Sequence, residues 1–142
     1  MRIAIGSDHR GFHAKQHLVP FLRNLGHEVQ DMGTLAAESC DYPDFALLVC
    51  KAITSGKAER GVLICGTNIG MCITANKVRG IRCALCWNTT TARLARQHNN
   101  ANMVSIGERV TGLEEVRDLV RVFLSTEFEG GRHQRRIDKI EP

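Results

Sequence analysis

The stretch VLICGTNIGM, residues 62–71, decides the fold, because an apolar run stops at Cys65 and opens directly into a glycine-rich turn. Residues 61–64 are apolar throughout, which is typical of a central parallel strand that is covered on both faces. A short helix over residues 70–77 is predicted to follow. Such a unit points several backbone N–H groups and the partial positive end of the helix at one spot. It therefore predicts a site for a phosphate, a carboxylate or a developing oxyanion.

Strand and helix patterns alternate along the chain on both sides of this unit. Further strands are predicted over 2–6, 27–33, 81–87 and 101–107, and further helices over 11–25, 41–54, 89–97 and 112–124. Alternation of this kind is typical of an α/β fold. We expect a single domain over 1–142, built on a Rossmann-like, doubly wound, mostly parallel five-stranded sheet. A last helix, beginning near Gly131, is expected to leave the body of the domain.

Composition narrows the class of protein. The chain has 142 residues, enough for one domain with a substantial core. Its six cysteines lie mostly in apolar runs, which favours reduced thiols and a cytoplasmic location. The net charge of +4 is mild, and much of it comes from a tail, GGRHQRRIDK, without interleaved aromatics, so no nucleic acid partner is expected. No apolar stretch approaches the about 20 residues of a membrane span, and the N-terminus lacks a signal-peptide pattern, so no membrane association is expected.

Polar residues follow the predicted strands at the ends where parallel α/β sheets bind ligands. These segments are residues 7–9, 31–33, 65–67 and 106–109, and we expect them along one edge of the sheet. Cys65 stands out, because a thiol near a helix N-terminus is expected to have a lowered pKa and to act as a nucleophile or a proton acceptor. Four other cysteines are interpreted as buried packing residues: Cys50, Cys72, Cys83 and Cys86.

Several other chemistries fit poorly. A cysteine-dependent phosphatase loop needs an arginine six positions after the cysteine, where Met71 stands. The CxxC pair at 83–86 lies within a predicted strand, with its side chains on opposite faces, so neither a redox pair nor a zinc half-site is predicted. Residues 6–11 match neither a dinucleotide-binding fingerprint nor a P-loop. His13 and His17 are interpreted as a polar helix face, and no metal site is predicted.

Six short motifs carry a family resemblance. In chain order they are residues 7–11, 41–43, 65–70, 96–99, 107–109 and 130–133. With them, the sequence from residue 3 to about residue 140 resembles ribose-5-phosphate isomerase type B, in a group that includes the subunits of galactose-6-phosphate isomerase. The resemblance implies interconversion of aldose and ketose phosphates without a metal or organic cofactor, by a homodimer with shared active sites. It leaves open whether dimers pair into tetramers.

The resemblance also implies roles for individual residues. Cys65 matches the base that moves a proton between C1 and C2 of the sugar, Thr67 supplies a hydroxyl, and His98 matches the residue that opens the furanose ring. Among the substrate-binding matches, Asp8 and His9 contact the sugar hydroxyls and the phosphate end, Tyr42 lines the same pocket, and Asn99 stands beside His98. The loop that holds the enediolate is matched by Gly66, Asn68, Ile69 and Gly70, and the phosphate clamp by Arg109, Arg132 and Arg136. Arg132 and Arg136 share one face of the terminal helix, which is expected to reach a partner subunit.

Two departures from the family pattern bear on the substrate. Asn68 stands where the family commonly has glycine; Asn tolerates unusual backbone angles, but its amide is expected to intrude on the sugar end of the pocket. Trp87 is either packing or a pocket wall. The leading interpretation is a ribose 5-phosphate isomerase. The alternatives are an isomerase of a six-carbon phosphate, such as allose 6-phosphate, and a non-catalytic phosphosugar-binding module, which would need neither Cys65 nor His98.

Overall fold

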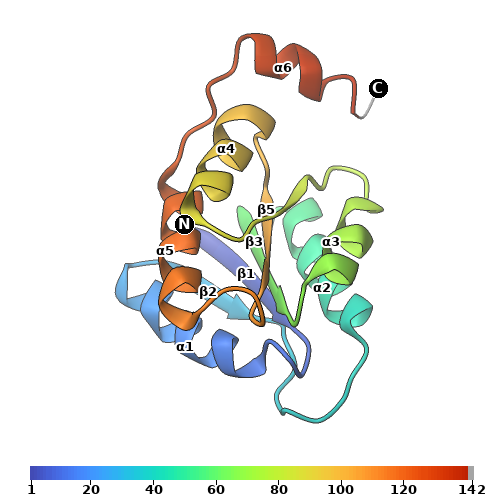
Figure 1. Ribbon diagram of the computed structural model, residues 1–142. Helices are drawn as coiled ribbons and strands as arrows, with labels where there is room; N and C mark the ends of the chain where they lie inside the picture. The colour runs from blue at the N-terminus through green and yellow to red at the C-terminus, as the bar shows by residue number, and fades with distance from the viewer. Residues whose placement is uncertain (141–142) are drawn as a thin grey trace.

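Strands and helices alternate through a single domain in the structure, a computed structural model that describes residues 1–140 (Figure 1). The last two residues of the predicted domain lie outside this range. The strands are β1 (Arg2–Ser7), β2 (Glu28–Asp31), β3 (Arg60–Cys65), β4 (Cys83–Leu85) and β5 (Met103–Gly107). The helices are α1 (Phe12–Asn24), α2 (Tyr42–Thr54), α3 (Ile69–Asn76), α4 (Thr89–Asn99), α5 (Leu113–Ser125) and α6 (Arg132–Ile137). None of the described helices has the length and apolar character needed to cross a bilayer.

The sheet has the strand order β2-β1-β3-β5-β4, and every neighbouring pair is parallel, so the expected mostly parallel sheet is wholly parallel. β3 lies at its centre, where Val62, Leu63 and Ile64 are fully buried, as the apolar run predicted. The two edge strands, β2 and β4, are the shortest. β4 is shorter than predicted because the N–H of Ile81 closes a turn on the carbonyl of Val78 instead of joining the ladder.

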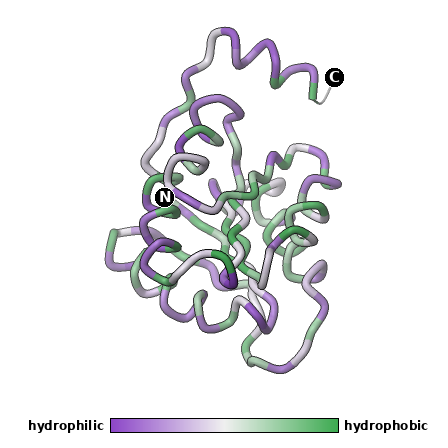
Figure 2. Tube along the Cα trace, in the orientation of Figure 1, coloured by the Kyte–Doolittle hydropathy of each residue, from purple (hydrophilic) through white to green (hydrophobic). Residues whose placement is uncertain are grey.

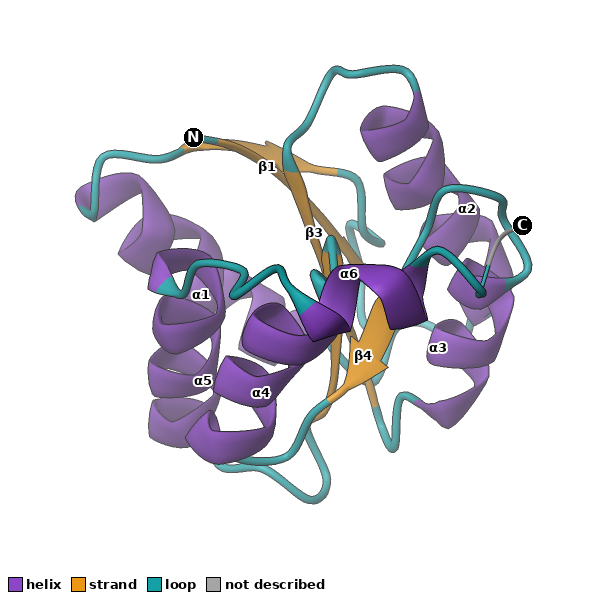
Figure 3. Cartoon of the chain, turned by 90° about the horizontal axis from the view of Figure 1, so that it is seen from above, coloured by secondary structure: helices purple, strands orange, loops and turns teal. Residues whose placement is uncertain are grey.

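Helices cover both faces of the sheet, as a doubly wound fold requires. α1, α4 and α5 pack on one face, and α2 and α3 on the other (Figure 3). Hydrophobic residues gather along the central strands, whereas α6 is mainly hydrophilic (Figure 2). Successive strand residues face opposite layers, so Ile64 joins one apolar cluster and Leu63 the other. Cys86 and Cys83 are divided in the same way, which confirms that the CxxC pair is split across the sheet.

The parallel topology gives the domain two different edges. Each helix that connects parallel strands returns the chain to the edge where the strands begin. The carboxyl edge therefore carries the ends of β1, β3 and β5 and the start of α3, whereas the amino edge carries the ends of α4 and α5. α6 lies across this amino edge (Figures 1 and 3). The backbone N–H of Glu129 donates to the carbonyl of Gln97 at 3.1 Å, which ties the segment before α6 to the end of α4.

Candidate active site

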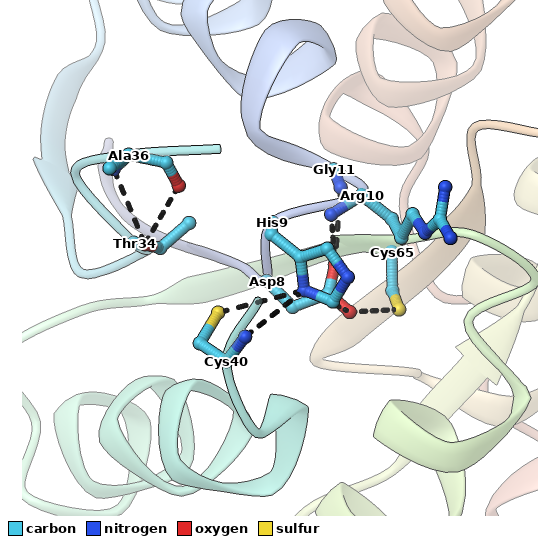
Figure 4. A network of polar contacts seen from close by, with 8 residues as sticks. All are labelled: Asp8, His9, Arg10, Gly11, Thr34, Ala36, Cys40 and Cys65. Carbon is cyan, nitrogen blue, oxygen red and sulfur yellow. Dashed lines mark hydrogen bonds and ion pairs between the residues drawn. The ribbon is translucent and has the colours of Figure 1, made fainter. Parts of the chain in front are cut away.

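Asp8 and Cys65 meet where β1 and β3 end side by side at the carboxyl edge (Figure 4). The Cys65 thiol donates to Asp8 Oδ2 at 2.7 Å. The other carboxylate oxygen, Oδ1, accepts the backbone N–H groups of Arg10 and Gly11 at 2.9 and 3.1 Å. Because Asp8 is buried and bonded on both oxygens, it holds the thiol in a fixed position.

The pKa of Cys65 is raised to about 12, which overturns the expectation of a lowered value. Burial of the thiol is the largest cause, followed by its hydrogen bond to Asp8 and the charge of that carboxylate. The backbone N–H groups of Gly66 and Asn68 do lower the pKa, as a helix N-terminus should, but they are outweighed. The thiol is therefore protonated at neutral pH. It can act as a base only after it has transferred its proton to a neighbouring acceptor.

Asn68 shapes the turn from below and does not intrude on the pocket. Its φ of 61° places it in the left-handed region, which explains the glycine or asparagine requirement. Its side chain is buried and donates through Nδ2 to the carbonyl of Leu63, and Ser105 Oγ donates to its backbone carbonyl at 3.1 Å. The expected intrusion of the amide on the sugar end is wrong, because the side chain points into the domain. Only the backbone of Asn68 faces the carboxyl edge as a candidate ligand.

The start of α3 presents donors at the same edge. The first backbone hydrogen bond of the helix runs from the N–H of Cys72 to the carbonyl of Asn68 at 3.1 Å. The N–H groups of Gly70 and Met71 come before it in the chain and therefore have no acceptor within the helix. The N–H of Ile69 is 3.5 Å from Thr67 Oγ1, and the Thr67 side chain is exposed. An anion placed over this turn would meet several donors and the positive helix end.

Tyr42 lies directly against the turn. A Cβ built on Gly70 would stand 2.4 Å from Cζ of the Tyr42 ring, so only glycine leaves room for this ring. The contact places Tyr42, the first residue of α2, beside the anion site.

Arg109 and His9 flank the turn. The N–H of Arg109 donates to the Gly66 carbonyl at 3.0 Å, and the Cδ atom of Arg109 lies 3.5 Å from the position that a Cβ on Gly66 would take. His9 Nδ1 lies 3.9 Å from Asp8 Oδ2 and accepts the N–H of Cys40 at 3.3 Å, which leaves the proton on Nε2.

Two residues beside this site were missed from the sequence. The Cys40 thiol lies 3.8 Å from His9 Nδ1, and Arg10 lies close to Cys65 and Gly66 (Figure 4). Arg10 belongs to a motif that was recognised, and its adjacency to Asp8 was the available signal. For Cys40 no sequence signal was available, because the loop before α2 brings it in.

The remaining predicted residues gather at the opposite edge of the sheet. His98 and Asn99 end α4, and a cavity of about 260 Å³ is lined by both of them together with His133 and Arg136 of α6. Arg132 begins α6 on the same side of the molecule. The structure of one chain thus brings the predicted residues together as two groups and separates His98 from Cys65, because α4 runs antiparallel to the strands (Figure 1).

This arrangement can bind a negatively charged ligand and move a proton, but one chain supplies only half of the predicted chemistry at each edge. The carboxyl edge has the thiol, the carboxylate, the N–H donors and Arg109. The amino edge has two imidazoles and two arginines. A group of three potential metal ligands in the described part of the chain, His98, Glu129 and His133, lies at the amino edge.

Comparisons with known proteins identify the family and the fold. The family model for ribose/galactose isomerase matches residues 3–140. Ribose-5-phosphate isomerase B of Escherichia coli is 45% identical over 98% of this chain and 93% of its own length. The structure of Clostridium thermocellum ribose-5-phosphate isomerase B superposes with a TM-score of 0.97 at 51% identity, covering 99% and 95% of the two chains. The Mycoplasma genitalium ribose-5-phosphate isomerase B structure with bound ribulose-5-phosphate has a TM-score of 0.93 at 45% identity, covering 98% and 93%.

Proposed function

Because the chain belongs to the ribose/galactose isomerase family, we propose that it interconverts ribose 5-phosphate and ribulose 5-phosphate. The single observation that carries the proposal is the hydrogen-bonded pair of Cys65 and Asp8 beside an anion-binding turn, in a chain with full-length likeness to such isomerases. A non-catalytic module would need the turn and the arginines, but not a thiol held against a buried carboxylate.

Cys65 is the proposed base, and Asp8 is the group that receives its proton. Passage of the thiol proton along the 2.7 Å hydrogen bond to Asp8 leaves a thiolate on Sγ. In the aldose-to-ketose direction, this thiolate takes the proton from C2, and the electron pair moves onto the C1 carbonyl oxygen to give the enediolate. Return of the proton from the Cys65 thiol to C1, with the hydroxyl proton on O2 passing to O1, gives the ketose.

The turn stabilises the enediolate in this scheme. Negative charge develops on an oxygen that faces the N–H groups at the start of α3, and preorganised donors of this kind are usually the largest catalytic contribution. The hydroxyl of Thr67 is assigned to carry the proton between the two enediol oxygens. Tyr42, His9 and Asp8 are assigned to the sugar, and Arg109 to the phosphate.

A complete site requires two copies of the chain, with the carboxyl edge of one against the amino edge of the other. His98 and Asn99 of the second copy would open the sugar ring, and its Arg132 and Arg136 would complete the phosphate clamp. The separation of these groups within one chain supports this arrangement, since His98 lies in the last turn of α4 at the amino edge and Cys65 ends β3 at the carboxyl edge. α6 is therefore assigned as the element that reaches a partner.

An apolar surface beside the turn supports the assignment of a homodimer. Ile69, Ile73, Trp87 and Val110 are each more than half exposed. Three of them, with Thr67 and Leu85, line a cavity of about 350 Å³ that opens next to the turn. A second copy seated here would cover apolar side chains that a single chain leaves in water, and would give Trp87 a packing role.

Free thiols support a cytoplasmic location for this enzyme. All six cysteines are unpaired in the structure, including the proposed base. A reducing compartment keeps such thiols available.

The test is turnover of ribose 5-phosphate by the purified chain, run beside allose 6-phosphate. We expect conversion of the pentose. Cys65→Ala should lower kcat by about 10²–10⁴-fold, which is the usual contribution of a positioned proton-transfer group to the rate. Cys72→Ala, which removes another half-buried thiol on α3, should not. Turnover of allose 6-phosphate alone would show that the substrate is a hexose phosphate and would leave the proposed mechanism unchanged. Equal activity of the Cys65→Ala and Cys72→Ala variants would show that Cys65 is not the base.

A further inference from the structure

The side chains of His98, Glu129 and His133, here called the amino-edge cluster, offer three metal-binding atoms within 4.8 Å of one another. The proposed reaction uses His98 and leaves the other two unexplained. His133 is almost buried, with a side chain that is 7% exposed, and its Nε2 lies 3.5 Å from Glu129 Oε2. The cluster thus offers two imidazole nitrogens and one carboxylate oxygen, which are common ligands of transition-metal ions.

The backbone fixes the three residues in place. His98 belongs to the last turn of α4, and the N–H of Glu129 is bonded to the neighbouring carbonyl of Gln97. His133 stands on α6 with its ring stacked on that of His98, at 4.3 Å between centroids and 10° between planes. The cluster therefore joins two elements and a connecting segment that already contact one another.

We propose that the amino-edge cluster binds a divalent transition-metal ion, with Zn²⁺ as the best match, and that the bound ion withdraws His98 from the isomerase reaction. Two imidazoles, one carboxylate and an open fourth position form a known type of zinc coordination. The second half of the proposal rests on the proposed function, because it takes His98 as the ring-opening residue. An imidazole nitrogen that is bonded to a metal cannot exchange a proton with the sugar.

The geometry favours the pair of Glu129 and His133 as the first ligands. Bonds of about 2.0–2.1 Å to a tetrahedral ion place ligand atoms about 3.3 Å apart. The 3.5 Å between His133 Nε2 and Glu129 Oε2 is already close to this spacing. The His98 ring must then turn, because two stacked parallel rings do not direct their in-plane lone pairs at one point. His98 is only partly buried at the end of its helix, so its side chain has room to turn.

The charges around the cluster set the strength of binding. The pKa of His133 is lowered, chiefly by burial and then by the charges of His98 and Arg132, which lessens the competition of protons with a metal ion. Glu129 supplies a negative charge, whereas Arg132 and Arg136 repel a cation. We therefore expect reversible binding, weaker than in a closed structural zinc site.

Calorimetric titration of the full chain with Zn²⁺, in a buffer that does not bind the metal, tests the site directly. We expect one ion per chain. Glu129→Gln and His133→Asn should each weaken binding at least about tenfold, because changes to groups that only support metal ligands already cost about 10–100-fold. Glu127→Gln is the matched control, since it removes the same charge from an exposed position two residues away, and it should bind zinc as the parent does.

Inhibition of turnover is the second readout. Zn²⁺ should inhibit ribose 5-phosphate turnover, a chelator should restore it, and the Glu129→Gln chain should keep parental activity while resisting zinc. Unchanged zinc affinity in both ligand variants would overturn the site. Loss of zinc binding in Cys65→Ala would overturn a site made by the amino-edge cluster alone, because it would make the thiol of a facing copy a required ligand. If the chain turned over no ribose 5-phosphate, the proposed function would fail while calorimetry still decided the metal site.

Discussion

The thiol of Cys65 donates a 2.7 Å hydrogen bond to the buried carboxylate of Asp8, and this contact joins the ends of two adjacent parallel strands. Burial first, and then this contact, raise the pKa of the thiol above that of a free cysteine, which is the opposite of what a helix N-terminus alone would produce. The base of the proposed reaction is therefore stored in its protonated form, next to an acceptor for the proton.

Asp8→Asn should increase the reactivity of Cys65 toward iodoacetamide at pH 8. The carboxylate raises the pKa of Cys65 through its hydrogen bond and its charge, so removing the charge lowers that pKa and increases the thiolate fraction. The rate is measured by mass spectrometry after cleavage at Met71, which places Cys65 and Cys72 on separate peptides. The Cys72 peptide is an internal control, because its pKa of about 7, lowered first by the Cys83 thiol, does not depend on Asp8. A slower Cys65 reaction in Asp8→Asn would contradict this account.

Asn68→Gly should destabilise the chain by about 1 kcal/mol. The change loses the side-chain bond to the Leu63 carbonyl and adds freedom to the unfolded chain, although glycine accepts the backbone angle without strain. Asn68→Ala should cost more, because a β-carbon at φ 61° adds about 1–2 kcal/mol. Urea denaturation of both variants measures the order. Greater stability of the alanine variant than of the glycine variant would contradict the cost assigned to the left-handed backbone angle, and parental stability in both variants would show that the inward amide bond does not hold the turn.

Gly70→Ala should lower kcat/KM by displacing Tyr42. The added methyl would stand 2.4 Å from the Tyr42 ring, so the ring or the turn must move at the proposed sugar site. A loss of about 10²-fold is expected for a misplacement of about 1 Å. Gly112→Ala is the control, since the nearest atom to its added carbon is 3.9 Å away. Steady-state kinetics that fail to separate the two variants would remove Tyr42 from the site.

Mixing two inactive variants should restore activity if the site is shared between copies. In a mixed dimer of Cys65→Ala and His98→Asn chains, one site carries both substitutions and the other carries neither. Random exchange should therefore return about a quarter of parental activity, as one intact site in half of the dimers requires. Turnover is measured after the variants are unfolded and refolded together, with each refolded alone as the control. No recovery in the mixture would place both residues in one chain's site.

The sequence was sufficient for the order of the elements and for the residues of the turn, because both depend on local pattern. The buried run at 62–64 and the glycines around it predicted β3 and the start of α3. Three features depended on contacts that no local pattern reports. The pKa of Cys65 is set by burial and by Asp8, which is far away in sequence. The direction of the Asn68 amide is set by a carbonyl in the strand below. The stack of His133 on His98 depends on where α6 comes to rest.

The two short strands at the borders of the sheet limit how copies of this chain can meet. β2 has four residues and β4 has three, so each border offers only a short row of unpaired backbone groups. A row of that length is a poor template for another strand, which protects the fold from edge-to-edge pairing of sheets into fibres. Association between copies is left to side chains on helices and loops, where single substitutions tune it, and not to a backbone ladder that accepts almost any sequence.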